Sequence, residues 1–259
     1  MSTRFTRALL RLPGENYAGG ITTSGEGAPL LARALEQHRA YAAALATCGL
    51  STYTLPADPR YPDGTFIEDA AVVTAHGAII TRPGAASRAG ETEAVAAALA
   101  PQVAELLSIE APGTVDGGDV CETDTGVLIG ITARTNEDGA RQLAARLAEL
   151  GFRATLVDVR GVAGLLHLKT GIAYLGDNRL AIAAGLPRLP ALDAYEPVVL
   201  APEERYAANC IRVNERVLVA AGYPKFAEAL SRLGYDPLPL EMGEFRKMDG
   251  GLSCLSLRF

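Results

Sequence analysis

One arrangement recurs along this chain of 259 residues and restricts the folds that it can adopt. A short hairpin is followed by an Ala- and Leu-rich connection and then by a single strand. The hairpins turn at His76-Gly77, Asp124–Gly126, Gly176–Asn178 and Asn214-Glu215. These turns lie roughly 40 to 50 residues apart, which is a typical length for a repeated supersecondary unit. The pattern therefore predicts four modules of one α/β architecture.

Amphipathic helices and glycine stops define the connections. Apolar residues fall on one stripe between Pro29 and Cys48, Gly49 is placed to end that helix, and residues 50–55 alternate as a strand. The same reasoning predicts further helices over about Glu91–Leu107, Glu137–Leu150 and Lys225–Leu233.

The two ends of the chain predict a closed ring. The strands expected at Phe5–Leu12 and Leu252–Phe259 have no partner within a module, and pairing them would supply the hairpin of a fifth module. The prediction is a five-bladed α/β propeller formed by a single domain over residues 1–259. We expect its mouth where the hairpins converge, with charged side chains projecting into one central pocket.

Composition excludes several classes of function. Lys and Arg number 24 against 30 Asp and Glu, with no basic run, which argues against a surface that binds nucleic acid. Arginines interrupt the N-terminal apolar stretch, and no apolar run approaches the roughly 20 residues that span a bilayer. We therefore expect a cytoplasmic protein with no membrane partner.

The four cysteines do not form a metal motif. Cys48, Cys121, Cys210 and Cys254 are scattered, with no Cys-x-x-Cys pair and no His at zinc-finger spacing. They are expected to be reduced thiols, most of them small buried hydrophobic residues.

Acidic residues precede two predicted strands. Asp63, Glu68 and Asp69 come just before an apolar strand, where an uncompensated charge is costly to bury and a cationic ligand would compensate it. Asp116 and Asp119 flank a Gly-Gly pair in the next module. Each segment alone is explained equally well by a solvated loop or a turn.

A cysteine and a histidine add reactive groups. Cys254 follows a glycine-rich loop at the entrance to the last predicted strand, and His167 lies in an apolar, strand-like run. Each has a purely structural alternative, an inert thiol and a hydrogen-bonded core histidine. Together with nearby acids they provide the groups of a Cys-His hydrolase. Because carboxylates raise the pKa of a thiol, these acids suit a cationic substrate that itself promotes formation of the thiolate.

Two arginines suggest the other end of the substrate. Arg88 lies in a loop and Arg134 follows the second hairpin, and their guanidinium groups are suited to a carboxylate. Acids at one end and arginines at the other would fit a zwitterionic amino acid with a cationic tail, although each arginine alone is equally a surface charge.

In this combination the motifs resemble the dimethylarginine dimethylaminohydrolase family of the pentein superfamily, whose members modify guanidino groups. The similar segments occur in family order over nearly the whole chain. They are Pro62–Asp69, Asp116–Val120, Arg134–Asn136, Leu166–Lys169, Ala207–Cys210 and Lys247–Cys254.

The resemblance implies a role for each candidate residue. Cys254 would be the nucleophile, His167 the general acid and base, and Asp116 the acid that orients the imidazole. The implied substrate-binding residues are Glu68 and Asp69 for the guanidinium, Asp63, Ile21 and Met248 for the amino group, Arg88 and Arg134 for the carboxylate, and the adjoining Asp249. Residues Gly19–Gly25 resemble the family's mobile lid.

The implied reaction is hydrolysis of a methylated arginine to citrulline and an amine through a covalent S-alkylthiouronium, with neither metal nor organic cofactor. Two rivals of the same superfamily stay open, an arginine deiminase and a citrulline hydrolase. A third alternative is a non-catalytic pentein that binds a partner protein. Relatives are often dimers, which makes a homodimer an expected assembly by analogy.

Overall fold

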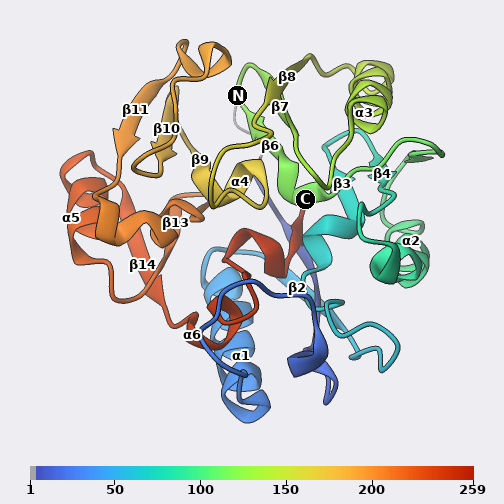
Figure 1. Cartoon of the computed structure of the whole chain (residues 1–259), viewed down its shortest axis with the longest axis horizontal. Helices are drawn as coiled ribbons and strands as arrows, with labels where there is room; N and C mark the ends of the chain where they lie inside the picture. Colours follow the sequence, from blue (N-terminus) through green and yellow to red (C-terminus); the bar gives the residue numbers. More distant parts are fainter. Residues whose placement is uncertain (1–3) are drawn as a thin grey trace.

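Five three-stranded sheets stand around a common centre in the computed structural model, which describes residues 4–259 (Figure 1). In every sheet the first strand is antiparallel to the second, and the second is parallel to the third. The sheets are β15 (Leu257–Arg258), β1 (Arg7–Arg11) and β2 (Ser51–Leu55); β3 (Ala71–Val73), β4 (Ala78–Ile80) and β5 (Leu106–Ser108); β6 (Val120–Thr123), β7 (Gly126–Ile131) and β8 (Ala154–Asp158); β9 (Ile172–Gly176), β10 (Arg179–Ile182) and β11 (Glu196–Val199); and β12 (Ile211–Val213), β13 (Arg216–Ala220) and β14 (Asp236–Leu240). The predicted five-bladed α/β propeller is confirmed.

Helices connect the two parallel strands in four of the five blades and lie on the outside of the ring (Figure 1). They are α1 (Leu31–Thr47), α2 (Thr92–Leu99), α3 (Glu137–Glu149) and α5 (Pro224–Arg232), and in the fourth blade the 3₁₀ helix η5 (Pro190–Leu192) takes this place. Gly49, Gly151 and Gly234 follow α1, α3 and α5 with φ of 90°, 87° and 88°, a left-handed conformation that glycine adopts without strain. None of the helices in the described residues is long and apolar enough to cross a bilayer.

The second helix is shorter than the sequence indicates. We predicted a helix over Glu91–Leu107, but α2 ends at Leu99, and Leu106–Ser108 form β5. Pro101 cannot donate the next helical hydrogen bond, and the apolar residues beyond it pair with β4 in parallel register. A short apolar run does not by itself distinguish a helix from a strand.

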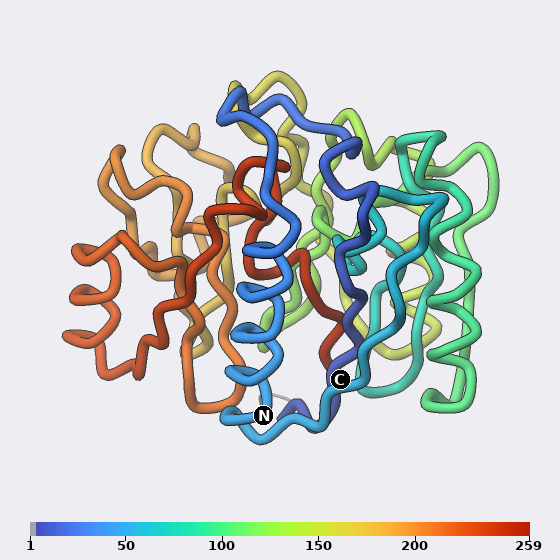
Figure 2. The backbone as a smooth tube through the Cα atoms, turned by 90° about the horizontal axis from the view of Figure 1, so that it is seen from below, coloured from blue at the N-terminus to red at the C-terminus, as the bar shows by residue number. Residues whose placement is uncertain are grey.

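The terminal strands close the ring, as predicted. Leu9 of β1 pairs with Leu257 of β15 in antiparallel register, while the other edge of β1 pairs with β2. β1 begins and β15 ends at the same end of the molecule (Figure 2). The last strand is shorter than the predicted Leu252–Phe259, because Ser253–Leu255 form the 3₁₀ helix η7 before β15 begins.

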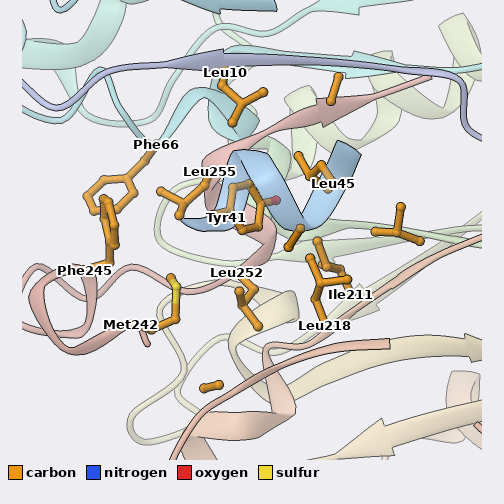
Figure 3. Packing of buried hydrophobic residues seen from close by; sticks show 14 of the residues in the cluster. Leu10, Tyr41, Leu45, Phe66, Ile211, Leu218, Met242, Phe245, Leu252 and Leu255 are labelled. Atoms are coloured by element: carbon orange, nitrogen blue, oxygen red, sulfur yellow. The ribbon is translucent and has the colours of Figure 1, made fainter. Parts of the chain in front are cut away.

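A hydrophobic cluster beneath α1 holds this last segment in place (Figure 3). Tyr41 is fully buried and packs in the same cluster as Leu252 and Leu255, the apolar residues on either side of Cys254. Burying a side chain of this size stabilises a fold by about 1.5–3 kcal/mol. The backbone that carries Cys254 is therefore anchored by apolar packing on both sides.

The two ends of the ring differ. Three of the hairpin turns line a cavity of about 480 Å³, through Asp124–Gly126, Gly176 and Asn214. At the other end a short helical segment precedes one strand of each blade, namely β3, β6, β9, β12 or β15, and we call these five the inner strands. The segments are η2 (Ile67–Ala70), η4 (Gly117–Asp119), α4 (Leu168–Gly171), η6 (Pro202–Ala208) and η7 (Ser253–Leu255). The prediction that the site lies where the hairpins converge is wrong, because most of the candidate residues gather at the end formed by these segments.

Candidate active site

A narrow cavity of about 30 Å³ opens among the short helical segments that precede the inner strands. Nine of the eleven residues singled out in the sequence line it, and Phe66, Leu166 and Gly250 complete the lining. The nine are Ile21, Asp63, Asp69, Arg88, Arg134, His167, Met248, Asp249 and Cys254. The chain thus brings together residues that are as much as 233 positions apart between Ile21 and Cys254.

His167 and Asp116 form a buried pair at this cavity. The Nε2 atom of His167 lies 3.0 Å from Oδ2 of Asp116, whose other oxygen accepts a hydrogen bond from the Gly84 amide. Burial lowers the pKa of His167, but the charges of Asp69, Asp116 and Asp119 outweigh it and raise the pKa to about 9. The imidazole therefore rests in its protonated form at neutral pH.

His167 does not lie in a strand, as its apolar surroundings suggested, but caps the short helix α4. Asp119 holds this helix because its Oδ1 accepts the Leu168 amide at 2.8 Å. Its other oxygen accepts hydrogen bonds from Thr132 and Thr135. The sequence drew attention to Asp119 beside the Gly-Gly pair but gave no sign that it fixes the backbone next to His167.

Cys254 lies in η7, ahead of the last strand, and is only partly exposed. Its Sγ accepts a hydrogen bond from the Gly251 amide at 3.4 Å. Burial, followed by the charges of Glu68 and Asp69, raises the pKa of the thiol to about 12. A Cβ atom at Gly250 would lie 2.2 Å from the Phe66 ring, so the loop before Cys254 can approach its neighbours closely only with glycine.

Adjacent acids in η2 have different surroundings. Asp69 lines the narrow cavity, accepts the Gly118 amide and pairs with Arg88 at 2.6 Å. Glu68 was assigned to the same guanidinium group, but it lines the larger cavity, where it pairs with Lys169 at 2.6 Å and accepts a hydrogen bond from Ser253 at 2.7 Å. Of these two adjacent acids, the structure therefore places only Asp69 at the cavity with Cys254.

The two arginines also have different partners. Arg88 is buried and already paired with Asp69 and Glu91. Arg134 is largely buried, its Nη1 has no hydrogen-bond partner in the described part of the chain, and it lies 4.0 Å from Asp116. Arg134 is thus the arginine whose donors are available for an incoming carboxylate.

A loop covers the cavity. The Ile21 amide donates to Asp63 at 3.1 Å, and the Thr23 amide donates to Asp249 at 2.6 Å. Ser24 donates to the Lys247 carbonyl at 2.6 Å. The cavity of about 30 Å³ is far smaller than the roughly 300–1,000 Å³ of a typical small-molecule site, so the space beneath this loop is too small for an amino acid.

A group of possible metal ligands already has partners. Ligand atoms of Asp69, Asp116 and His167 all lie within 4.8 Å of one another. Asp116 is hydrogen bonded to His167, and Asp69 is paired with Arg88. These contacts fit a network of alternating charges, in which each of the two carboxylates already has a partner.

The larger cavity is not where these groups meet. It is lined by the hairpin turns and by Cys121 and Cys210, and burial raises the pKa of these two thiols to about 11 and 12. Neither His167 nor Asp116 lines it. We therefore place the chemistry at the smaller cavity.

Comparisons with known proteins identify the family of this chain. No protein-family model matches the chain. It is 45% identical over 256 residues to the N(G),N(G)-dimethylarginine dimethylaminohydrolase of Pseudomonas aeruginosa, covering 98% of this chain and 100% of that protein. It is 39% identical to the enzyme of the same name from Streptomyces coelicolor, covering 97% and 96%.

A solved structure of the Pseudomonas aeruginosa enzyme, a cysteine-to-serine variant in complex with citrulline, superposes with a TM-score of 0.95. The identity is 44%, and the superposition covers 99% of this chain and 100% of that one. With identity of this level over essentially the full length and the same fold, this chain belongs to the dimethylarginine dimethylaminohydrolase family of enzymes.

Proposed function

We propose that this chain hydrolyses Nω-methylated arginines, releasing citrulline and dimethylamine or methylamine. The observation that carries the proposal is the convergence of Cys254, the His167–Asp116 pair and the acid Asp69 on one narrow cavity. The names of the two relatives and the citrulline bound to one of them support the same substrate class.

Charge selects the substrate. Asp63 and Asp69 give the cavity negative charge, and Asp69 would exchange Arg88 for the guanidinium group of the substrate. Arg134 would receive the substrate's carboxylate with its Nη1, which has no hydrogen-bond partner among residues 4–259. The lid residue Ile21, with Met248 and Asp249, would enclose the amino end.

Formation of a covalent intermediate is the first half of the reaction. When the cationic substrate binds, the Cys254 thiol gives its proton to solvent, and the resulting thiolate attacks the central guanidinium carbon to form a C–S bond. The C–N bond to the methylated nitrogen then breaks as His167 donates its proton, and dimethylamine or methylamine leaves. Asp116 orients the imidazole throughout. The product of this half is an S-alkylthiouronium on Cys254.

Hydrolysis completes the cycle. His167, now neutral, takes a proton from water, and the oxygen attacks the same carbon. The C–S bond breaks, the sulfur leaves as the thiolate, and citrulline is released. One water molecule is consumed for each amine released.

The decisive measurement is a product assay with dimethylarginine, monomethylarginine, arginine and citrulline. We expect citrulline and the amine from the two methylated arginines, and a loss of kcat of more than about 1,000-fold in Cys254→Ser and in His167→Gln. Release of ammonia from arginine at a higher kcat/KM would instead identify an arginine deiminase, and ornithine from citrulline a citrulline hydrolase.

The compartment is part of the same proposal. All four cysteines are free, and Cys254 needs its free thiol for the reaction. A reducing compartment keeps thiols in this state. We propose that the enzyme acts in the cytoplasm.

A further inference from the structure

The fivefold arrangement of the site leaves one blade without an assigned residue. The helical segments before the inner strands place Asp69, Asp116, His167 and Cys254 at the site in four blades. The equivalent segment of the remaining blade, η6, ends at Ala208, and Asn209 caps it two residues before β12 begins. Asn209 belongs to the Ala207–Cys210 segment that the sequence singled out without giving it a task.

Asn209 joins the segment of His167 to the segment of Cys254. Its Nδ2 donates to the carbonyl oxygen of Lys169, two residues after His167, at 3.1 Å. Its Oδ1 accepts the backbone amide of Ser253, the residue before Cys254, at 2.9 Å. The side chain is buried, and a backbone acceptor on one side and a backbone donor on the other fix the orientation of its amide group.

A closed circuit of polar contacts surrounds this connection. Nδ2 of Asn209 also lies 3.1 Å from Oγ of Ser253, which donates to Glu68, and Glu68 in turn pairs with Lys169. A Cβ atom at Gly251 would lie 2.4 Å from Asn209, so the loop before Cys254 packs directly on the amide. The side chain of Asn209 therefore forms a short, buried link between the two segments, and these polar contacts and the packing of Gly251 hold it in place.

We propose that Asn209 is a positioning residue that sets the placement of Cys254 relative to His167. For its effect on turnover this inference rests on the proposed function. An amide is required because only it offers one donor and one acceptor in this geometry. An aspartate would face the Lys169 carbonyl with a second acceptor and would add a negative charge beside Glu68 and Cys254.

The test compares Asn209→Ala and Asn209→Asp with a matched control. Asn214, in the hairpin turn of the same blade, also accepts one backbone amide (Phe5) and donates to two carbonyls (Phe5 and Cys48). Asn214→Asp therefore removes the same kind of donor at the opposite end of the ring. For each variant we would measure kcat and KM, the thermal midpoint, and the rate at which chloroacetamidine alkylates Cys254, located by mass spectrometry.

We expect kcat to fall on the order of 100-fold in Asn209→Asp, and less in Asn209→Ala, with KM changed by less than about threefold, because a displacement of about 1 Å costs this much in rate. Alkylation of Cys254 should slow in the same order. Asn214→Asp should lower the thermal midpoint about as much as the Asn209 variants do. Its kcat and its rate of Cys254 alkylation should stay within about twofold of the wild-type values, because distant sites act independently.

Unchanged kcat and alkylation rates in both Asn209 variants would overturn the proposal, as would equal losses in Asn214→Asp. The alkylation readout separates this inference from the proposed function. If wild-type protein releases no citrulline but the Asn209 variants still slow alkylation, the hydrolase assignment fails and the positioning role stands. If wild-type protein is active and the variants match it in both readouts, the positioning role alone fails.

Discussion

The protonation states of two residues explain why the site requires a cationic substrate. With the pKa of His167 near 9 and that of Cys254 near 12, the resting site holds an imidazolium and a neutral thiol. Burial and the nearby carboxylates both disfavour the thiolate. A guanidinium group beside Asp69 would offset these charges and lower the pKa of the thiol. The nucleophile is then formed only when the substrate is present.

Alkylating reagents of different charge test this idea. At pH 7 the cationic chloroacetamidine should alkylate Cys254 at least about 10-fold faster than neutral chloroacetamide, after correction for their rates with a free thiol, because a cation at the acids favours the thiolate. Mass spectrometry would locate the modification, with Cys254→Ser as the control. Equal corrected rates would show that the charge of the ligand has no part in activation.

The raised pKa of His167 also predicts how stability depends on pH. The folded-state pKa of about 9 lies above the unfolded value of 6.5, so this stabilisation is complete below about pH 6.5 and is lost as pH rises through 9. A difference of this size corresponds to about 3 kcal/mol.

Urea unfolding between pH 6 and pH 9.5 would measure this dependence. The two proteins compared are Cys254→Ser, in which this thiol no longer titrates, and the double variant Cys254→Ser/His167→Gln. The free energy of unfolding should fall less with rising pH in the double variant than in Cys254→Ser. An equal slope in both proteins would mean that His167 is not the group that titrates.

At the scale of elements, the hairpins and terminal strands were predictable, while the short helical segments were not. Alternating apolar runs around Gly, Asn and Asp turns identify a hairpin without tertiary information, as at Asn178, which has a positive φ of 59°. The segments before the inner strands have only three to seven residues, and their apolar side chains resemble strands. His167 and Cys254 were both placed in strands for this reason, although contacts from other blades hold each of them in a helical turn.

Under the proposed function, the lid over residues 19–25 is the element that would open to admit the substrate. Oδ2 of Asp249 accepts hydrogen bonds from the Thr23 amide and from the hydroxyls of Thr22 and Thr23. Asp249→Asn keeps a residue that tolerates the positive φ of 58° at this position but removes the charge. Hydrogen bonds to charged groups contribute about 1.5–3 kcal/mol, so loss of the charge should raise the fraction of molecules with an open lid. Cleavage of residues 19–25 by a nonspecific protease should then accelerate on the order of 10-fold.

Limited proteolysis of the variant and of wild-type protein would test this, with KM for dimethylarginine measured in parallel and expected to rise. Thr23→Val, which removes one hydroxyl, should give a smaller change in the same direction. If Asp249→Asn is cleaved no faster than wild-type protein, Asp249 does not hold the lid closed.

At the scale of the whole molecule, the five blades and their closure followed from the sequence, but the end of the ring that carries the site did not. Residues next to each other in sequence can face opposite ends of the ring, as Glu68 and Asp69 do. The sequence shows that both residues are acidic, but only the packing of the folded chain determines which cavity each side chain lines. The pairing of Arg88 with Asp69 was invisible for the same reason, since these residues lie 19 positions apart and meet only in the folded ring.

Closure of the ring should be measurable through Leu257. This residue is buried on β15 opposite Leu9, so Leu257→Asp should destabilise the protein by roughly 3 kcal/mol or more, because it buries an unpaired charge. Leu106→Asp, at a half-exposed position on β5, is the matched control and should cost less than about 1 kcal/mol. Urea unfolding of both variants would check the difference, and equal costs would mean that β15 contributes little to the stability of the ring.

The place of Cys254 ties its sulfur to the seam of the ring. The residue lies just ahead of β15, the strand that joins the last blade to β1. Any change that unzips this seam would therefore also release the segment that carries the thiol, so closure of the propeller and assembly of the proposed catalytic group are one and the same event.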